Sequence, residues 1–325
     1  IYTGEDTLSL HDALPISAMA LALGAGFSMP AAAEPESTDP IKIALFDWTS
    51  VNLNATILSK ILKSYGYNTE LVTSDYLASI QTGLRTGDLT IGMEYWDTTA
   101  REAMADADAS GETENLGPIG PKAKEEWWFP EYMKEKCPGL PNWEALKGCA
   151  EAFSTPETAP KGRYLGGPVT WGGFDDERVE ALDLPFEVVH AGTDAAMFAE
   201  LESAYQRKAP IILWIYTPHW APAKFKGEWV QFPEWTPECY NDPAWGSNPD
   251  KAYDCGKPHG EIYKYSWKGF AEKWPVAHKI AKNMKFSDDE MNQLIGQVDL
   301  DKKSLDEVAD AWIAANGDKI KQWAE

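Results

Sequence analysis

The chain lacks the features of the common enzyme classes and has little positive charge. No run approaches about twenty apolar residues, so a typical membrane-spanning helix is excluded. The motifs G-x-S-x-G and H-E-x-x-H are absent, no glycine-rich phosphate loop follows a strand, and the five histidines are scattered. Only 29 Lys and Arg stand against 51 Asp and Glu, and a net charge of −22 disfavours nucleic acid and anionic lipid as partners. We therefore expect no catalytic residue, no cofactor and no metal.

Cysteine is also scarce, with four residues in 325. They fall into two close pairs, Cys137 with Cys149 and Cys239 with Cys255, and each pair brackets a loop that contains Pro and Gly. An even count in an exported chain favours disulfides, each contributing about 3 kcal/mol for loops of this size. A zinc site built from all four is the alternative, but no C-x-x-C pair is present.

The N-terminal region predicts export. Residues 1–16 resemble a translated sequencing-library adapter, the alternative being a genuine but unusual N-terminus. Residues 17–33 are apolar and end in small residues, which is typical of a signal peptide that has lost its basic start. Ala33-Glu34 stands where a lipoprotein would carry its acylated Cys. We expect a mature chain that is soluble and periplasmic, with no membrane insertion.

What is abundant is tryptophan. The chain has 15 Trp and 13 Tyr, where about a third as many Trp would be ordinary. Indole rings fill cores, and they also offer a negative face to a cation that has no proton to donate. Several stand where a loop or strand end is expected. A subset of the rings is therefore interpreted as a cage for a small methylated cation.

The order of elements predicts an open α/β sheet. Strands are expected at 41–46, 69–72 and 89–93, with helices from Asn52 to Tyr65 and from Tyr76 to Leu84 between them. This order implies parallel, right-handed crossovers. Ligands bind beyond the carboxyl ends of such strands, where Trp48 and Trp96 fall.

The rest of the chain predicts a second lobe and a helical tail. A turn is expected over 111–120, followed by a strand over 125–129 and another α/β series that ends in the apolar strand 211–215. The tail from Trp267 onwards is helical and has no sheet of its own. We therefore expect lobe 1 to comprise 41–121 plus 260–325 and lobe 2 to comprise 122–259, with a ligand cleft between the lobes and a hinge that closes on ligand.

Three segments share a plan in which an aromatic residue at a strand end precedes small or turn-forming residues. They are 94–98 (EYWDT), 168–173 (PVTWGG) and 214–220 (WIYTPHW). These segments resemble the cage motifs of the glycine betaine/proline betaine-binding proteins of ABC importers, and 47–50 (DWTS) is similar to a turn of their choline-binding relatives. The resemblance runs in order from Ile41 to the final helix.

The resemblance implies a type II, two-lobed periplasmic binding protein fold. It also implies a monomer that binds a betaine-like zwitterion (glycine betaine, proline betaine or dimethylsulfoniopropionate, with choline weaker) and delivers it to a membrane permease and an ATPase. Position by position, it implies a quaternary ammonium held by aromatic faces and a carboxylate held by backbone N–H groups. The implied ligand-binding residues are Trp48, Trp96, Trp127, Trp171, Gly172, Gly173 and Tyr216.

The sequence departs from the family in places. A His that contacts the carboxylate in some relatives is Ala100 here, with Arg101 or His219 as possible substitutes. The Asp of the choline-type turn is Ser50, which weakens a choline assignment. Glu94 is expected to be a solvated loop acid. The alternative function is a carbohydrate-active enzyme or sugar-binding protein, since Trp also stacks on sugar rings.

Overall fold

The structure, a computed structural model, describes residues 35–325. The predicted adapter-derived segment (1–16) and signal peptide (17–33) lie outside the described residues. Within the described part, every helix is too short or too polar to cross a membrane.

The first α/β series folds as the sequence predicts. Strand β1 (Ile41–Leu45) pairs in parallel with β2 (Thr69–Thr73) and β3 (Ile91–Trp96). Helix α1 (Thr49–Ser64) connects β1 to β2 and buries an apolar stripe because its Leu and Ile residues recur at helical spacing. The helix ends where Gly66 adopts a positive φ of 91°. The connection to β3 is α2 (Tyr76–Ala78), a π-helical turn (Ser79–Gly83) and α3 (Leu84–Thr86).

The C-terminal tail returns to this first lobe. Strand β9 (Gly260–Trp267) pairs antiparallel with β3. Lys264 of this strand is buried, and its ammonium donates to the carbonyls of Ala281, Lys282 and Met284, which caps the end of helix α11. The tail helices are α10 (Phe270–Lys273), α11 (Pro275–Asn283), α12 (Asp288–Asp299), α13 (Leu305–Ala315) and α14 (Gly317–Ala324).

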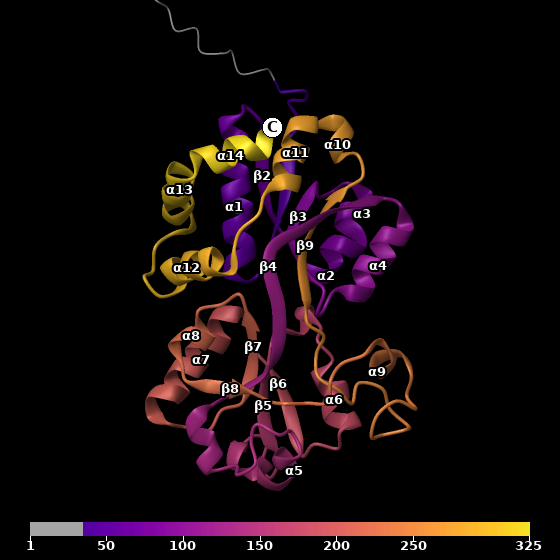
Figure 1. Cartoon of the computed structure of the whole chain (residues 1–325), viewed down its shortest axis with the longest axis vertical. Helices are drawn as coiled ribbons and strands as arrows, with labels where there is room; N and C mark the ends of the chain where they lie inside the picture. The colour runs from indigo at the N-terminus through magenta and orange to yellow at the C-terminus, as the bar shows by residue number, and fades with distance from the viewer. Residues whose placement is uncertain (1–34) are drawn as a thin grey trace, which may run out of the picture. The chain divides into compact units, whose positions relative to one another are not determined.

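One long strand, β4 (Thr113–Pro130), follows helix α4 (Arg101–Ser110) and runs from the first group of strands into the second (Figure 1). Its first part pairs with β9 and its second part with β7 and β8. The predicted turn over 111–120 is therefore wrong from Thr113 onwards. Gly117 and Gly120 have positive φ and bend the strand at two irregularities, while pairing with β9, a strand remote in sequence, keeps it extended.

The second lobe is built on β7 (Leu213–Thr217), β5 (Gly162–Gly166) and β6 (Phe186–His190), with β8 (Gly227–Trp229) beside β4. Its two disulfides, Cys137–Cys149 and Cys239–Cys255, confirm the predicted use of all four cysteines. Its α-helices are α5 (Ala145–Cys149), α6 (Asp175–Ala181), α7 (Asp194–Arg207), α8 (Ala221–Lys224) and α9 (Pro237–Asn241). Its 3-10 turns are η2 (Glu131–Glu135), η3 (Ala150–Phe153) and η4 (Val169–Trp171).

The two groups of strands correspond to the predicted lobes, and the sheet order is β2-β1-β3-β9-β4-β7-β5-β6. Because β4 belongs to both groups, the lobes share a strand instead of being joined by short linkers. The division at 121/122 and 259/260 remains a proposal.

Candidate functional site

A cavity lies where the carboxyl ends of β1 and β3 approach β7 and η4. Seven residues line it, and its free volume is about 20 Å³. Four of the seven were predicted from the sequence. The lining residues are Trp48, Tyr76, Trp96, Thr99, Glu125, Trp171 and Tyr216.

Five aromatic side chains line the cavity. Besides Tyr76 they are Trp48, Trp96, Trp171 and Tyr216, and these four are called the wall rings below. The ring centroids of Trp48 and Trp171 are 5.7 Å apart at an interplanar angle of 81°. The rings of Trp171 and Tyr216 are 5.8 Å apart at 80°, and those of Trp96 and Tyr216 are 5.5 Å apart at 86°. Rings that meet at near right angles are arranged like the walls of a box, which surrounds a compact guest on several sides.

The wall rings come from four separate places in the chain. Trp48 precedes α1 in an extended conformation, and Trp96 is the last residue of β3. Trp171 ends η4, and Tyr216 lies near the end of β7. The two lobes each contribute two rings, so the box is complete only when they are together.

Each polar edge of a wall ring is bonded to a carboxylate. Trp48 Nε1 and Trp96 Nε1 both donate to Glu94 Oε2, at 2.7 and 3.2 Å. Trp171 Nε1 donates to Asp47 at 2.7 Å, and the Tyr216 hydroxyl donates to Asp194 at 2.7 Å. These bonds fix the ring orientations and place acids behind the rings.

Three acids around the cavity have raised pKa values because burial disfavours their charged forms. The pKa of Glu94 is raised to about 7, although four side-chain donors to its carboxylate oppose the effect of burial. Burial likewise raises the pKa of Glu125 to about 7 and that of Asp194 to about 8. A cation in the cavity would favour the ionised forms of Glu94 and Asp194, which accept hydrogen bonds from wall rings.

Trp127 does not line the cavity. Its ring is fully buried and stacks on Tyr164 with centroids 3.8 Å apart, while its Nε1 donates to Asp175 at 2.8 Å. Residue 127 faces the interior of lobe 2 because β4 has already entered that lobe, where its pairing with β7 sets the orientation. The geometry places Trp127 in the core of lobe 2, apart from the wall rings.

The two predicted glycines also lie outside the cavity. Gly172 lines a neighbouring groove with Thr98 and Thr99, and its N–H donates to the carbonyl of Val169. Gly173 has a φ of 109°, and a Cβ there would lie 2.3 Å from the Trp214 ring. Its lack of a side chain therefore serves close packing.

The two suggested substitutes for the carboxylate-binding His lie elsewhere too. Arg101 pairs with Asp97 at 3.0 Å and stacks over Trp235 with its guanidinium 4.8 Å from the ring centroid. His219 is buried behind Tyr216, at a ring distance of 4.9 Å. Neither side chain lines the cavity.

Sequence reasoning missed Tyr76, Thr99 and Glu125 and misplaced Glu94. Glu94 is only 1% exposed, so the expectation of a solvated acid is wrong. The sequence could have indicated this position, because side chains two residues apart in a strand point to the same face, and Glu94 precedes Trp96 by two residues. Tyr76 is positioned by its hydroxyl, which accepts from the Trp96 backbone N–H at 2.8 Å.

Comparisons of the chain with known protein families, sequences and structures agree with this architecture. Residues 39–315 match the family described as the substrate binding domain of ABC-type glycine betaine transport systems. The chain is 32% identical over 319 residues to the trimethylamine N-oxide-binding protein of Pelagibacter ubique, covering 95% of this chain and 96% of that protein.

Two solved structures have the same fold. One is lactococcal OpuAC in its closed-liganded conformation with glycine betaine (TM-score 0.67, 17% identity, 88% of this chain and 100% of that one). The other is an ABC-transporter choline binding protein in complex with choline (TM-score 0.71, 20% identity, 89% of this chain and 93% of that one). They confirm the predicted two-lobed periplasmic binding protein fold.

The family match also confirms the expectation of a binding protein instead of an enzyme. With 277 of its residues (39 to 315) covered by one family model, the chain belongs to the family of substrate-binding domains of ABC-type glycine betaine transport systems.

Proposed function

We propose that this substrate-binding protein captures a small methylated onium compound between its four wall rings. The observation that carries the proposal is whether a Lys or Arg side chain of the protein lies over the face of each ring. Eight other tryptophans have a Lys or Arg of the chain over their rings, as Trp214 has Lys257 at 3.9 Å and Trp229 has Lys124 at 4.3 Å. Among residues 35–325, no Lys or Arg stacks on a wall ring.

The chemistry of the walls suits an onium group. Methylated nitrogen or sulfur has no hydrogen to donate, so hydrogen-bond acceptors alone select poorly for it, whereas aromatic faces attract its charge. Each desolvated cation–π contact is worth about 2 kcal/mol, and a few of them reach micromolar affinity. Glu94 and Asp194 behind the rings add attraction when ionised.

The cavity favours a short ligand. Its free volume of about 20 Å³ lies far below the roughly 300–1,000 Å³ of sites for drug-sized molecules. Its lining includes no Lys, Arg or His to pair with a carboxylate. Glu125 lines it instead, and with a pKa of about 7 this acid is partly protonated near neutral pH and can donate a hydrogen bond.

These features support trimethylamine N-oxide as the first candidate ligand, which the relative from Pelagibacter ubique binds according to its name. The N-oxide has one compact acceptor oxygen, which a protonated Glu125 or the Thr99 hydroxyl can satisfy. The sequence-based list of ligands did not include it. Glycine betaine is the second candidate, supported by the family description and by the liganded lactococcal structure.

The partners and location follow from the same proposal. We expect a membrane permease and an ATPase to receive the ligand from a monomeric, periplasmic binding protein. Two disulfides support an extracytoplasmic location, since such bonds persist in oxidising compartments. Fractionation of cells that express the chain behind a complete signal peptide tests this; recovery in the cytosol, or in membranes after a salt wash, would overturn it.

Calorimetry of residues 34–325 against a panel of ligands tests the binding proposal. The panel is trimethylamine N-oxide, glycine betaine, proline betaine, dimethylsulfoniopropionate and choline, with maltose and proline as controls that lack a methylated onium group. We expect micromolar binding of trimethylamine N-oxide or glycine betaine and none of the controls. Binding of a control with no response to any onium compound would contradict the proposal.

A further inference from the structure

Asp299 occupies an unusual position for an acid, because it is the last residue of helix α12. The carbonyl end of a helix carries partial negative charge, so a carboxylate there is unfavourable. The same helix has three acids in its first turn, where the dipole favours them, and a complete capping box at Ser287. Asp299 therefore does not serve the stability of its own helix.

Its contacts point across the lobes instead. Asp299 Oδ2 accepts from Trp220 Nε1 of lobe 2 at 2.8 Å. Asp299 Oδ1 accepts from Thr49 Oγ1 of lobe 1 at 2.6 Å. The carboxylate thus bonds one residue from each lobe, and its side chain is only 18% exposed.

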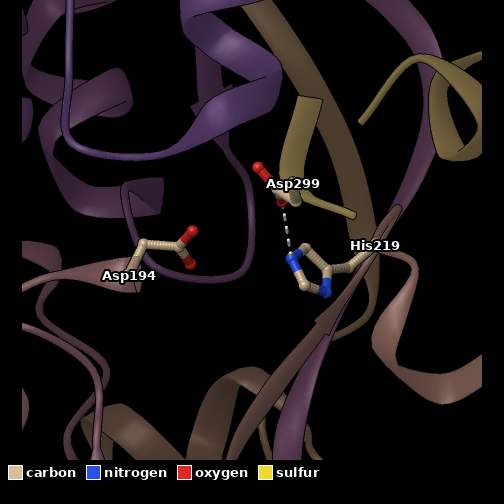
Figure 2. A group of neighbouring side chains, drawn as sticks. All are labelled: Asp194, His219 and Asp299. Carbon is tan, nitrogen blue, oxygen red and sulfur yellow. Dashed lines mark ion pairs between the residues drawn. The ribbon is translucent and has the colours of Figure 1, made fainter. Parts of the chain in front are cut away.

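A third donor from lobe 2 points at the same carboxylate. Among the described residues, His219 Nε2 is buried without a hydrogen-bond partner, 3.7 Å from Asp299 Oδ2. Figure 2 shows the His219 ring directed at Asp299. The His219 ring is neutral, since burial lowers its pKa to about 3. The Ala221 N–H donates to Nδ1 at 3.2 Å, so the single ring proton is on Nε2 and faces Asp299.

This tautomer distinguishes two interpretations of the cluster. Ligand atoms of Asp194, His219 and Asp299 lie within 4.8 Å of one another, which is the spacing of a candidate metal site. A metal on Nε2 would move the proton to Nδ1, where it would oppose the Ala221 N–H. The protonated Nε2 is instead a third donor that a closer approach of the lobes would bring into hydrogen-bonding range.

Residues beside Asp299 adjoin a wall ring in each lobe. Thr49 directly follows Trp48 in the chain. His219, beside Trp220, packs against Tyr216 at a centroid distance of 4.9 Å. A contact at Asp299 is therefore transmitted to one wall ring in each lobe.

We infer that Asp299 is a positioning residue that holds the lobes closed over the ligand by accepting hydrogen bonds from Trp220 and, on full closure, from His219. It touches no ligand, and it acts through the relative position of the wall rings. The part of this inference that concerns affinity rests on the proposed function, whereas the part that concerns closure does not.

The test compares Asp299→Ala with Asp301→Ala. The second variant is a matched control, because it removes the same charge from an exposed side chain two residues further along the chain. Affinity is measured by calorimetry with trimethylamine N-oxide and glycine betaine. Loss of charge-assisted hydrogen bonds is expected to weaken binding about tenfold in Asp299→Ala. Asp301→Ala is expected to stay within about twofold of the wild type.

Two further measurements distinguish a residue that holds the lobes closed from one that only stabilises the fold. The ligand-free melting temperature of Asp299→Ala should change little, because removal of an unfavourable charge from the helix end offsets the lost bond to Thr49 within lobe 1. Trp220→Phe removes the donor and keeps a ring; combined with Asp299→Ala, it should weaken binding no further than Asp299→Ala does alone, because both remove one contact. Additive losses, or unchanged affinity in Asp299→Ala, would overturn the inference.

Small-angle scattering and metal titration complete the test. With saturating ligand, Asp299→Ala should remain more extended than the wild type. If the wild type binds no member of the panel, the proposed function fails. In that case, equal ligand-free radii of gyration for wild type and Asp299→Ala would by themselves overturn the inference about closure. Stabilisation by Zn²⁺ or Mn²⁺ that is lost in His219→Ala would overturn it in favour of a metal site.

Discussion

Two aromatic clusters of this protein have similar composition and opposite surroundings. The wall rings surround a cavity, whereas a core cluster, defined as Trp127, Tyr164, Phe186 and Trp214, fills lobe 2. Both contain an indole that donates to a buried acid, as Trp48 does to Glu94 and Trp127 does to Asp175. Residue type and hydrogen bonding alone therefore do not distinguish a binding site from a core.

The difference lies in what covers the ring faces. In the core cluster, Tyr164 covers Trp127, and the ammonium of Lys257 lies 3.9 Å from the centroid of Trp214. Asp175 and the carbonyl of Gly173 satisfy that ammonium. The core thus contains its own cation with its own counter-charge. The wall rings have acids behind them and no Lys or Arg of residues 35–325 on them, which is the arrangement that the proposed binding of an external cation requires.

The largest effect that separates the two clusters is expected from Trp127→Ala. Removing a fully buried indole leaves a cavity and takes one donor from the buried Asp175, and should lower the free energy of unfolding by about 3–5 kcal/mol. Denaturant titration measures the loss. Ligand affinity of the remaining folded protein should be unchanged, and a variant with wild-type stability and lost binding would return Trp127 to the site.

The converse result is expected from Trp96→Ala and Trp171→Ala. Each should weaken ligand binding at least tenfold, or about 1.4 kcal/mol, because one cation–π wall is lost. The melting temperature without ligand should fall less than that of Trp127→Ala, since each of these rings borders a cavity instead of being packed on all sides. Calorimetry and thermal unfolding of the same samples decide the matter. Variants that unfold, while their folded fraction binds normally, would show that these rings are packing residues.

A smaller effect concerns the acid behind two wall rings. Folded Glu94 has a pKa of about 7, against about 4.3 in the unfolded chain, so between these values the folded state binds more protons. Its contribution to stability is present below about pH 4.3 and is lost as pH rises through 7, by at most about 1.4 kcal/mol per pH unit.

Unfolding free energies measured between pH 5 and 8 check this prediction. Glu94→Gln should give a shallower fall than the wild type, with a residual slope from Glu125 and Asp194, whose pKa values are also raised. Identical slopes in the two proteins would mean that Glu94 is ionised throughout, as its four donors favour.

The smallest effect tests which groups of the protein attract the charged part of the ligand. Trimethylamine N-oxide and glycine betaine carry no net charge, so the acidic surface attracts them weakly, and their affinities should change less than about twofold when salt rises from about 50 to 500 mM. Choline carries a net positive charge, and any binding of it should weaken more. A steep salt dependence for the neutral ligands would place the binding energy on exposed acids instead of desolvated ring faces.

Much of the fold was determined by local sequence patterns. Apolar positions at strand and helix spacing located β1, α1, β2 and β3, and the position of Trp48 and Trp96 after strands predicted two wall rings. Trp171 and Tyr216 came from motifs that resemble a known family. The spacing of the cysteines also predicted the observed disulfides.

Other features depended on contacts between segments remote in sequence. The Gly and Pro content of residues 113–120 predicts a turn, and only their pairing with β9 makes them part of β4. Trp127 and Trp171 are both indoles bonded to an acid, yet only the folded sheet decides that one faces the lobe 2 core and the other the cavity. The contact from Asp299 to Trp220 joins residues 79 positions apart. The sequence thus determined the elements and the residue types of the proposed cage, whereas tertiary structure decided which rings line the cavity, because that depends on which remote segments pack beside each ring.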